Sequence, residues 1–312
     1  MIHPQDERNE MHEVVQEYAA QQVAVGFSWT ECPRWHDGAF YFSDMYAARV
    51  IRVDTDGSWS VYADFSDRVG LDGARVVTVG IDFLPDGRLI ANSMFERVVL
   101  VWDGRQAEVY ADLRPFAPGP VNDMVVDADG RAYVTQLGYD IWKGETPVQT
   151  PLLLVETDGS VRELREAGPL TAANGITISA DGRTVVTAEA PENRLIAFDR
   201  ASDGTLTAPR VFAELDLLPD GICFDADGAV WVAQPGGGAV IRVVEGGEIT
   251  ARVPVDPERG GRTTACGLGG EGRRTLYVCC GFEVWDFDAS VRGAQGSIWV
   301  AEVPVGAGQA RP

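Results

Sequence analysis

The sequence predicts an all-β fold, a six-bladed β-propeller with four antiparallel strands in each blade. Three observations support this prediction. An Asp-Gly turn, replaced by Glu-Gly in the last copy, recurs six times at intervals of 43 to 52 residues. Each turn precedes a run of β-forming residues with no helical period. In most copies a second turn follows, flanked by two further strand-like runs, so each unit reads as four short strands joined by hairpins.

The turns and the runs after them define the repeat. The turns are Asp37-Gly38, Asp86-Gly87, Asp129-Gly130, Asp181-Gly182, Asp227-Gly228 and Glu271-Gly272. The runs are AFYFSD, RLIANS, RAYVTQ, RTVVTAE, AVWVAQ and TLYVCC. One such sheet cannot bury both of its faces, and radial stacking solves this because each blade covers its neighbour. A large β-sandwich is the alternative, and six copies in register disfavour it.

The two ends of the chain are expected to close the ring. We expect a strand at residues 23–27 to pair with the last blade, which ends in SIWVAEVPV. Residues 23–312 then form a single propeller domain. Residues 1–22 form an N-terminal extension, in which residues 6–22 are expected to make a short, peripheral, polar helix.

Composition narrows the class of partner. The net charge of −21 repels phosphate backbones and anionic lipid surfaces, so nucleic-acid and membrane partners are not expected. The five cysteines are an odd number without a C-x-x-C pair, which argues against a disulfide framework or a structural zinc. The N-terminus lacks an apolar signal core and no apolar run is long enough to span a bilayer, so we expect a cytoplasmic protein with a small-molecule substrate; its oligomeric state stays open.

The repeat also predicts a site. The first strand of each blade lines the central channel, and the residues just before these strands meet at one channel mouth. Aligning the six units on that strand gives a first column of Glu31, Val79, Asn122, Asn174, Asp220 and Cys266. The next column is Cys32, Gly80, Asp123, Gly175, Gly221 and Gly267, mostly small residues that let the backbones approach closely.

The first column brings two acids and two amides together from four blades. Asn or Asp before Gly is also ordinary turn chemistry, but four oxygen-bearing residues in one ring column favour a shared function. Two carboxylates at a water-poor mouth need a cation or shared protons. Oxygen donors suit one hard divalent cation, calcium first, with magnesium, manganese or zinc as substitutes.

Several other chemistries find no support. The only histidines are His3, His12 and His36, none of which lies in the column. There is no G-x-S-x-G elbow, no H-E-x-x-H and no P-loop. Cys266 lies in the column as aligned, but it has no histidine partner, so we interpret it as a small packed residue rather than a nucleophile.

The quoted segments resemble the senescence marker protein / gluconolactonase / luciferin-regenerating enzyme family over about residues 24–305. The resemblance is carried by ECPRW with FSD at 42–44, VND with DADGR, NGITISADGRTV, PDGICFDADGAVWVA, and RTTACGLGG leading to TLYV. It implies a metal held by Glu31, Asn174 and Asp220, with Asn122 in or beside the shell. It also implies that Asp220 is the base that activates water.

One departure from the family bears on the substrate. Sugar-lactone members place an Arg two residues before the blade-three Asn, and this chain has Pro120 there. Arg49, Arg75 and Arg97 are possible replacements from other loops. The expected pocket residues are mostly apolar: Met45, Tyr46, Met94, Phe95, Leu137, Tyr139 and Trp142. We therefore expect a less polar substrate than a sugar acid lactone.

The sequence as a whole favours a metal-dependent hydrolase that opens a lactone, with Asp220, or alternatively Asp123, accepting a proton from the attacking water. A phosphotriester or aryl ester hydrolase of the same fold is an alternative. A non-catalytic propeller, binding a ligand or a protein around a structural metal, is another, because fold alone does not decide function.

Overall fold

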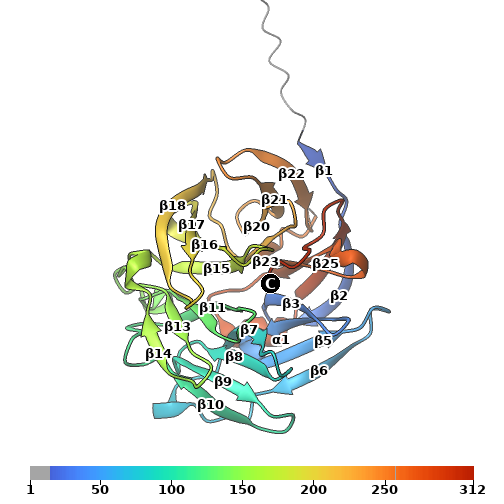
Figure 1. Ribbon diagram of the computed structural model, residues 1–312. Coiled ribbons are helices and arrows are strands. Elements are labelled where there is room, and N and C mark those ends of the chain that lie inside the picture. Colours follow the sequence, from blue (N-terminus) through green and yellow to red (C-terminus); the bar gives the residue numbers. More distant parts are fainter. Residues whose placement is uncertain (1–14, 257) are drawn as a thin grey trace, which may run out of the picture.

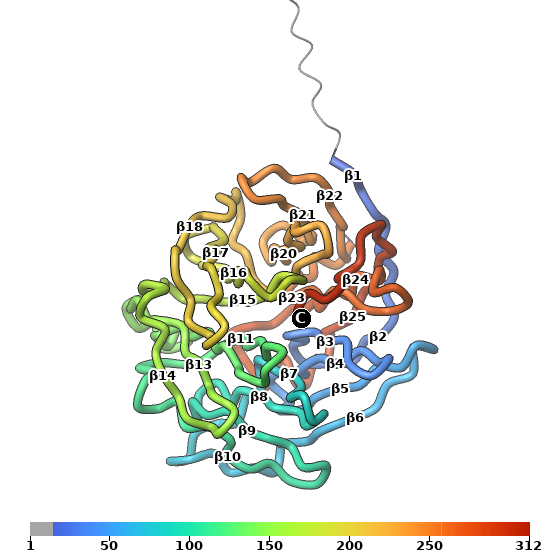
Figure 2. The backbone as a smooth tube through the Cα atoms, in the orientation of Figure 1, coloured from blue at the N-terminus to red at the C-terminus, as the bar shows by residue number. Residues whose placement is uncertain are grey.

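The computed structural model describes residues 15–256 and 258–312, which form six sheets arranged radially around one axis (Figures 1 and 2). Four consecutive positions in each sheet are paired in antiparallel fashion, as a propeller blade requires. The predicted six-bladed propeller is confirmed. Among the described residues, no helix has the length and apolar character needed to cross a bilayer.

The strands fall into four concentric rings. The innermost strands are β3 (Thr30–His36), β7 (Thr78–Phe83), β11 (Val121–Val126), β15 (Ala173–Ile178), β19 (Ile222–Phe224) and β23 (Arg262–Gly269). The second strands are β4 (Ala39–Asp44), β8 (Leu89–Ser93), β12 (Ala132–Gln136), β16 (Thr184–Glu189), β20 (Val230–Gln234) and β24 (Thr275–Gly281). The third strands are β5 (Arg49–Val53), β9 (Val98–Trp102), β13 (Leu153–Val155), β17 (Arg194–Arg200), β21 (Ala239–Val243) and β25 (Gly296–Glu302). The outermost strands are β6 (Trp59–Asp64), β10 (Ala107–Asp112), β14 (Val161–Glu163), β18 (Leu206–Glu214), β22 (Ile249–Pro254) and β2 (Gln21–Phe27).

Short helices lie in the loops between the strands. They are η1 (Met45–Ala47), η2 (Leu71–Gly73), η3 (Ile141–Lys143), η4 (Arg165–Ala167), η5 (Ala190–Glu192), η6 (Glu271–Arg273) and α1 (Phe287–Gly293). Of these, η3 and α1 contribute residues to the cavity described below. In the part of the chain that the structure describes, α1 is the one α-helix; the others are single 3₁₀ turns, which are common as connectors.

The N-terminal segment closes the ring, as expected. Strand β2 pairs antiparallel with β25, Gln21 lying opposite Val300, and so becomes the outer strand of blade six. The seam is packed as well as hydrogen-bonded: the ring of Phe27 meets that of Phe42 in blade one edge to face, with centroids 4.8 Å apart. Edge-to-face pairs of this kind stabilise a contact beyond the area they bury.

The expected helix at residues 6–22 is corrected by the structure. Residues 6–14 lie outside the described residues, and residues 15–22 are not helical. Strand β1 (Gln16–Glu17) pairs in parallel with β22, Gln16 opposite Ala251, and the Tyr18 N–H donates to Arg252 O at 3.0 Å. The exposed edge of blade five has unpaired backbone N–H and C=O groups. An extended segment can hydrogen-bond to them, whereas a helix uses its backbone groups internally.

The core lies between the faces of neighbouring blades. Blades four, five and six share one cluster, in which Val186, Trp231 and Leu268 are almost fully buried. Blades one and two share another, which includes Val50 and Leu100. All five cysteines are buried and free, as the odd count indicated. Each blade thus covers the apolar face of the next, which is why no single blade is a folding domain.

The C-terminal residues lie on the axis at the end of the inner strands away from Asn174 (Figure 1). Arg311 forms a two-way backbone bridge with Ile178, the last residue of β15, and its carbonyl accepts a hydrogen bond from Thr177 Oγ1 at 2.6 Å. Arg273 Nη1 donates to Ala310 O at 3.1 Å. The tail therefore covers one end of the channel and leaves the other end as the mouth.

The inner strands carry a β-bulge at the same level in several blades. In β11 the pairing with β12 shifts between Val121 and Met124, and in β15 the pairing with β16 shifts between Ala173 and Ile176. A bulge leaves backbone groups without ladder partners and re-aims side chains. Threonines of the second strands supply those partners, because Thr135 Oγ1 and Thr187 Oγ1 donate to Asp123 O and Gly175 O at 3.2 and 3.0 Å.

The bulges bring inner-strand backbones unusually close. A Cβ on Gly80 would lie 2.7–2.8 Å from backbone atoms of the β11 bulge, and one on Gly175 would lie 2.5 Å from Asp220 O. A Cβ on Gly221 would lie 2.3 Å from the Cβ of Ala265. These positions need glycine because a side chain has no space, as expected from the second column of the sequence alignment.

Gly175→Ala is expected to lower the free energy of unfolding by about 3 kcal/mol, the upper range for overpacking, because backbone atoms cannot move aside as a side chain can. Urea unfolding measures the change. Gly236→Ala is the matched control, since a Cβ there meets nothing within 4 Å. Equal stability of the two variants would show that the ring tolerates expansion at the bulge.

Candidate active site at the channel mouth

The structure places the four predicted ligands at the level of the bulges, on blades one, three, four and five. Glu31 lies on β3, Asn122 on β11 and Asn174 on β15, while Asp220 comes two residues before β19. Glu31, Asn122 and Asp220 are buried and Asn174 is half-buried. The side chain of Asn174 hydrogen-bonds Asp220, and the carboxylates of Asp220 and Glu31 are close enough to repel.

Glu31 is held in place by two donors. Trp29 Nε1 donates to Oε1 at 3.2 Å, and the Cys32 N–H donates to Oε2 at 3.3 Å. Neither donor is charged, so the carboxylate is oriented but its charge is not balanced. A carboxylate in this setting is a ready ligand for a cation that approaches from the mouth.

Burial shifts the acid–base equilibria of both column acids. Burial is the main cause that raises the pKa of Asp220 from 3.8 to about 8; the Asn174 hydrogen bond lowers it and the nearby charge of Asp123 raises it. Burial and then the charge of Asp220 raise the pKa of Glu31 well above its usual range. Both carboxylates are stable in the ionised form only when a cation balances their negative charge.

Asp123, the alternative base, has a different environment. Its Oδ1 accepts from Arg34 Nη2 at 3.1 Å and from the Met124 N–H at 2.7 Å. Arg34 is itself buried and its Nε lies 3.7 Å from Asp82 Oδ2. The negative charge of Asp123 is therefore balanced from within the channel, unlike the charges of the two column acids.

Sequence reasoning missed Arg34 and Trp29. Arg34 lies three residues after Glu31 on the same inner strand, and a charged residue on a strand that lines a channel was a detectable sign of a buried ion pair. Trp29 precedes β3, outside the aligned units, so the repeat gave no means of finding it.

The predicted register of blade six is wrong by two residues. The first regular pair after the bulge is Ile81 with Ala91 in blade two, and the equivalent pair in blade six is Cys266 with Val278. The hairpin enclosed by this pair is therefore two residues longer in blade six than in blade two. The first-column position in this blade is therefore Thr264, whose Oγ1 donates to Thr30 O at 2.5 Å. The second-column position is Ala265 rather than Gly267, and it faces Gly221.

Cys266 accordingly lies below the column, inside the core. Its Sγ is 3.5 Å from Trp231 O and 4.0 Å from Cys223 Sγ. Burial raises the pKa of its thiol well above the usual range, so it is no thiolate at neutral pH. The interpretation of Cys266 as a packed residue agrees with this position.

The donor set fits a hard divalent cation. Within residues 15–256 and 258–312, no three His, Cys, Asp or Glu side chains gather closely enough to hold a metal ion. The predicted set has only two carboxylates, and amide oxygens of Asn122 and Asn174 complete it. Oxygen-only sets of acids and amides are typical of calcium and unsuited to a thiolate-seeking metal.

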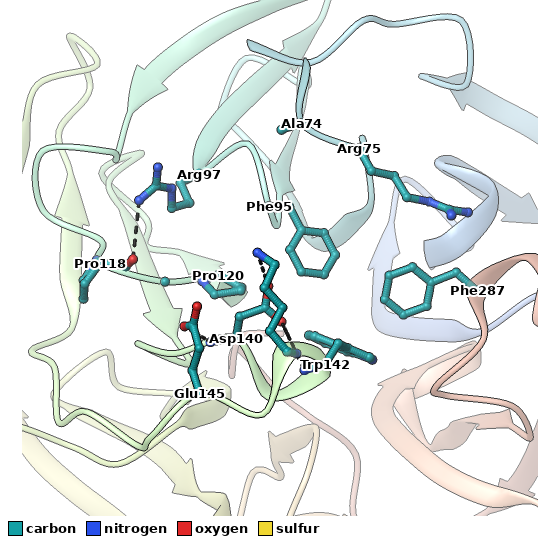
Figure 3. A pocket seen from close by; sticks show the side chains of 12 residues that line it. Ala74, Arg75, Phe95, Arg97, Pro118, Pro120, Asp140, Trp142, Glu145 and Phe287 are labelled. Atoms are coloured by element: carbon teal, nitrogen blue, oxygen red, sulfur yellow. Dashed lines mark hydrogen bonds and ion pairs between the residues drawn. The ribbon is translucent and has the colours of Figure 1, made fainter. Parts of the chain in front are cut away.

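A cavity of about 520 Å³ opens beside the column, over blades two and three (Figure 3). Its volume is in the range of small-molecule sites. Of the expected pocket residues, Phe95 and Trp142 line it. Pro120 also lines it, two residues before Asn122, which connects the cavity wall to the column. The column acids themselves are not part of its lining.

The other expected pocket residues are placed differently. Met45, Tyr46 and Met94 are buried in the core shared by blades one and two, and Leu137 and Tyr139 pack in or against it. The error has a physical reason: η1 and the turn after β8 fold back onto the sheet, so their apolar side chains cover the blade instead of facing solvent.

Two of the three possible replacement arginines reach the cavity. Arg75 and Arg97 line it, whereas Arg49 pairs with the buried Asp44. Lys143 also contributes to the wall and is paired with Asp140 at 2.9 Å. The mouth therefore has cationic groups close to Pro120, and the expected apolar character of the pocket holds for only part of its wall.

The chain is similar to known proteins over most of its length. Residues 29–281 match the SMP-30/Gluconolactonase/LRE-like region family. A 6-deoxy-6-sulfogluconolactonase from Pseudomonas putida is 27% identical over 80% of this chain and 81% of its own length. A pentonolactonase from Haloferax volcanii is 26% identical over 80% of each chain. The calcium-binding protein regucalcin from Agrobacterium tumefaciens superposes with a TM-score of 0.73 at 20% identity, covering 93% of this chain and 96% of that one, which shows the shared fold.

The raised pKa of Asp220 predicts that the metal-free protein, kept in chelator, loses stability as pH rises. The folded protein holds a proton up to pH about 8, whereas the unfolded chain releases it near 3.8. The contribution is fully present below pH about 4 and is lost by pH about 8. Urea unfolding across this range measures it. Asp220→Asn makes the slope smaller, the remainder coming from Glu31, and Asp37→Asn, on an exposed turn, retains the full slope; an unchanged slope in Asp220→Asn would contradict the assignment.

Proposed function

Because the chain belongs to the SMP-30/gluconolactonase/LRE-like family, we propose that it is a metal-dependent lactonase that adds water to a cyclic ester. One observation carries the proposal. Glu31 and Asp220 are buried close together without a charge-balancing Arg or Lys among the described residues, and two amides complete the ring of oxygens. Relatives named as lactonases support the reaction class.

Glu31, Asn174 and Asp220 would hold the metal, with Asn122 as a direct or water-mediated ligand. We propose calcium, with magnesium, manganese or zinc as substitutes. The oxygen donors support this choice, and a structural neighbour is described as a calcium-binding protein. When bound, the cation polarises the carbonyl of the lactone and stabilises negative charge on its oxygen.

Side chains of the protein carry out the proton transfers of the reaction. Asp220 accepts a proton from water as its oxygen attacks the carbonyl carbon, and Asn174 holds the carboxylate by its hydrogen bond. The ring C–O bond breaks, and Asp220 returns the proton to the departing alkoxide. The products are a carboxylic acid, which ionises by releasing its proton to solvent, and an alcohol in one molecule. Asp123 is less suited to this role because Arg34 and the Met124 N–H already occupy its Oδ1.

A hydrolysis panel tests the proposal. Lactones, aryl esters and a phosphotriester are offered to the protein in chelator and after calcium, magnesium, manganese or zinc is added back. We expect lactone opening that chelator abolishes and a metal restores. A preference for the phosphotriester would favour the alternative hydrolase, and the absence of turnover together with tight metal binding would favour a non-catalytic propeller.

Asp220→Asn is expected to reduce kcat by at least about 100-fold, the usual range for loss of a general base, while metal affinity falls less. The amide oxygen still ligates but cannot accept a proton at neutral pH. Kinetics and calorimetric metal titration of the same preparation separate the two effects. Asp123→Asn is the comparison variant: if it is inactive while Asp220→Asn stays active, Asp123 is the base.

A further inference from the structure

The cavity beside the column has an aromatic wall built from three separate elements (Figure 3). Phe95 comes from the turn after β8, Trp142 from η3 and Phe287 from α1. The Trp142 ring meets those of Phe95 and Phe287 edge to face, with centroids 5.3 and 5.4 Å away. The wall is thus a continuous apolar surface that faces the cavity, although its parts are far apart in the sequence.

Phe287 reaches this wall because residues 282–295 leave blade six between β24 and β25 and cross toward blades two and three. The family match ends at residue 281, just before this segment. Trp142 Nε1 and Tyr46 Oη both donate to Val284 O, at 2.9 and 3.1 Å. Ser290 Oγ donates to Ser28 O at 3.0 Å. The segment is therefore a fastened cap over the mouth.

The cap is linked to the column through a chain of aromatic rings. Trp29, which donates to Glu31, has its ring 6.0 Å from that of Tyr46. The Tyr46 ring stacks on Phe287 with centroids 4.3 Å apart and an interplanar angle of 17°. The cavity wall is therefore joined to the column by packed aromatic rings, and the same cavity is also lined by Pro120, two residues before Asn122.

Of the three cationic side chains that line the cavity, Arg97 is the one without a carboxylate partner among the described residues. Arg75 is paired with Asp288 at 3.0 Å and Lys143 with Asp140 at 2.9 Å. Arg97 Nη1 donates to the carbonyls of Ala117 and Pro118 at 2.9 and 3.5 Å, and among the described residues no carboxylate lies within ion-pair distance of it. Guanidinium N–H groups that are not used internally can bind a carboxylate in bidentate geometry.

Building on the proposed lactonase function, we propose that the substrate is a lactone with two recognition groups. An aryl or bulky alkyl substituent packs against Phe287, Phe95 and Trp142, and a carboxylate binds Arg97. Phe287 and Arg97 are then specificity residues. They take over the role of the family's blade-three Arg, which Pro120 cannot fill because it has no donor.

Three probes test the proposal with the metal-loaded wild-type protein: γ-butyrolactone, its γ-phenyl derivative and its γ-carboxy derivative. We expect kcat/KM for each derivative to exceed that of the parent by about 10-fold or more, the scale of one good apolar contact or one charged hydrogen bond. Isothermal titration of the two derivatives measures recognition separately from turnover.

Each specificity residue has a matched control. Phe287→Ala is expected to lose most of the phenyl-to-parent ratio and keep the carboxy-to-parent ratio, while Trp285→Ala, an exposed ring on the same cap, changes neither. Arg97→Gln loses the carboxy ratio and Arg97→Lys retains part of it, while Arg105→Gln, on an exposed turn, leaves it unchanged. Thermal unfolding of each variant confirms that the ring is intact.

The outcomes separate the two proposals. If the wild type opens γ-butyrolactone but gains nothing from either substituent, the substrate inference is wrong and the lactonase stands. If no lactone is opened yet both derivatives bind in a Phe287- and Arg97-dependent manner, the recognition surface stands and the hydrolase does not. If Phe287→Ala and Trp285→Ala behave alike, the aromatic wall only packs the cap.

Discussion

The fold and the site both depend on how closely the inner strands approach one another at the bulges. At Gly80, Gly175 and Gly221 there is no space for even a Cβ beside the neighbouring backbone. Because the second-column residue is pressed against the next blade, the residue before it is turned toward the mouth. Ring closure therefore brings Glu31, Asn122, Asn174 and Asp220 to the mouth, where hydrogen bonds from Trp29 and Cys32 orient Glu31.

The charges in the channel are arranged in two layers. At the mouth, Glu31 and Asp220 have neutral donors only, and burial raises the pKa of each. Deeper in the channel, Arg34 lies between Asp123 and Asp82 and forms an ion pair with each of them. In the upper layer the negative charges of the acids have no cationic partner. In the lower layer the charged groups pair with one another, and such buried networks make a structure more rigid.

The fold could be predicted from the sequence because the same hairpin occurs six times. Where the strand pattern of one copy is ambiguous, the other copies show how to align it. The column was found for the same reason, and it was misread where a hairpin differs in length: the hairpin of blade six is two residues longer, which moves Cys266 out of position. What does not repeat could not be predicted. Trp29 and the cap at residues 282–295 each occur once, and their contacts join blades that are distant in the sequence.

The pairing of β2 with β25, which closes the ring, can form only after nearly the whole chain has been synthesised. Strand β2 begins at residue 21, yet its partner β25 is not available until residues 296–302 have been made. During synthesis at about 5–20 residues per second, the first strand therefore waits while five blades form behind it with an uncovered face. Contacts this distant in sequence slow folding and leave strand edges open to wrong partners. The parallel pairing of β1 with β22 becomes possible slightly earlier, when blade five is complete, and it can hold the N-terminal segment beside the gap into which the last blade must fit.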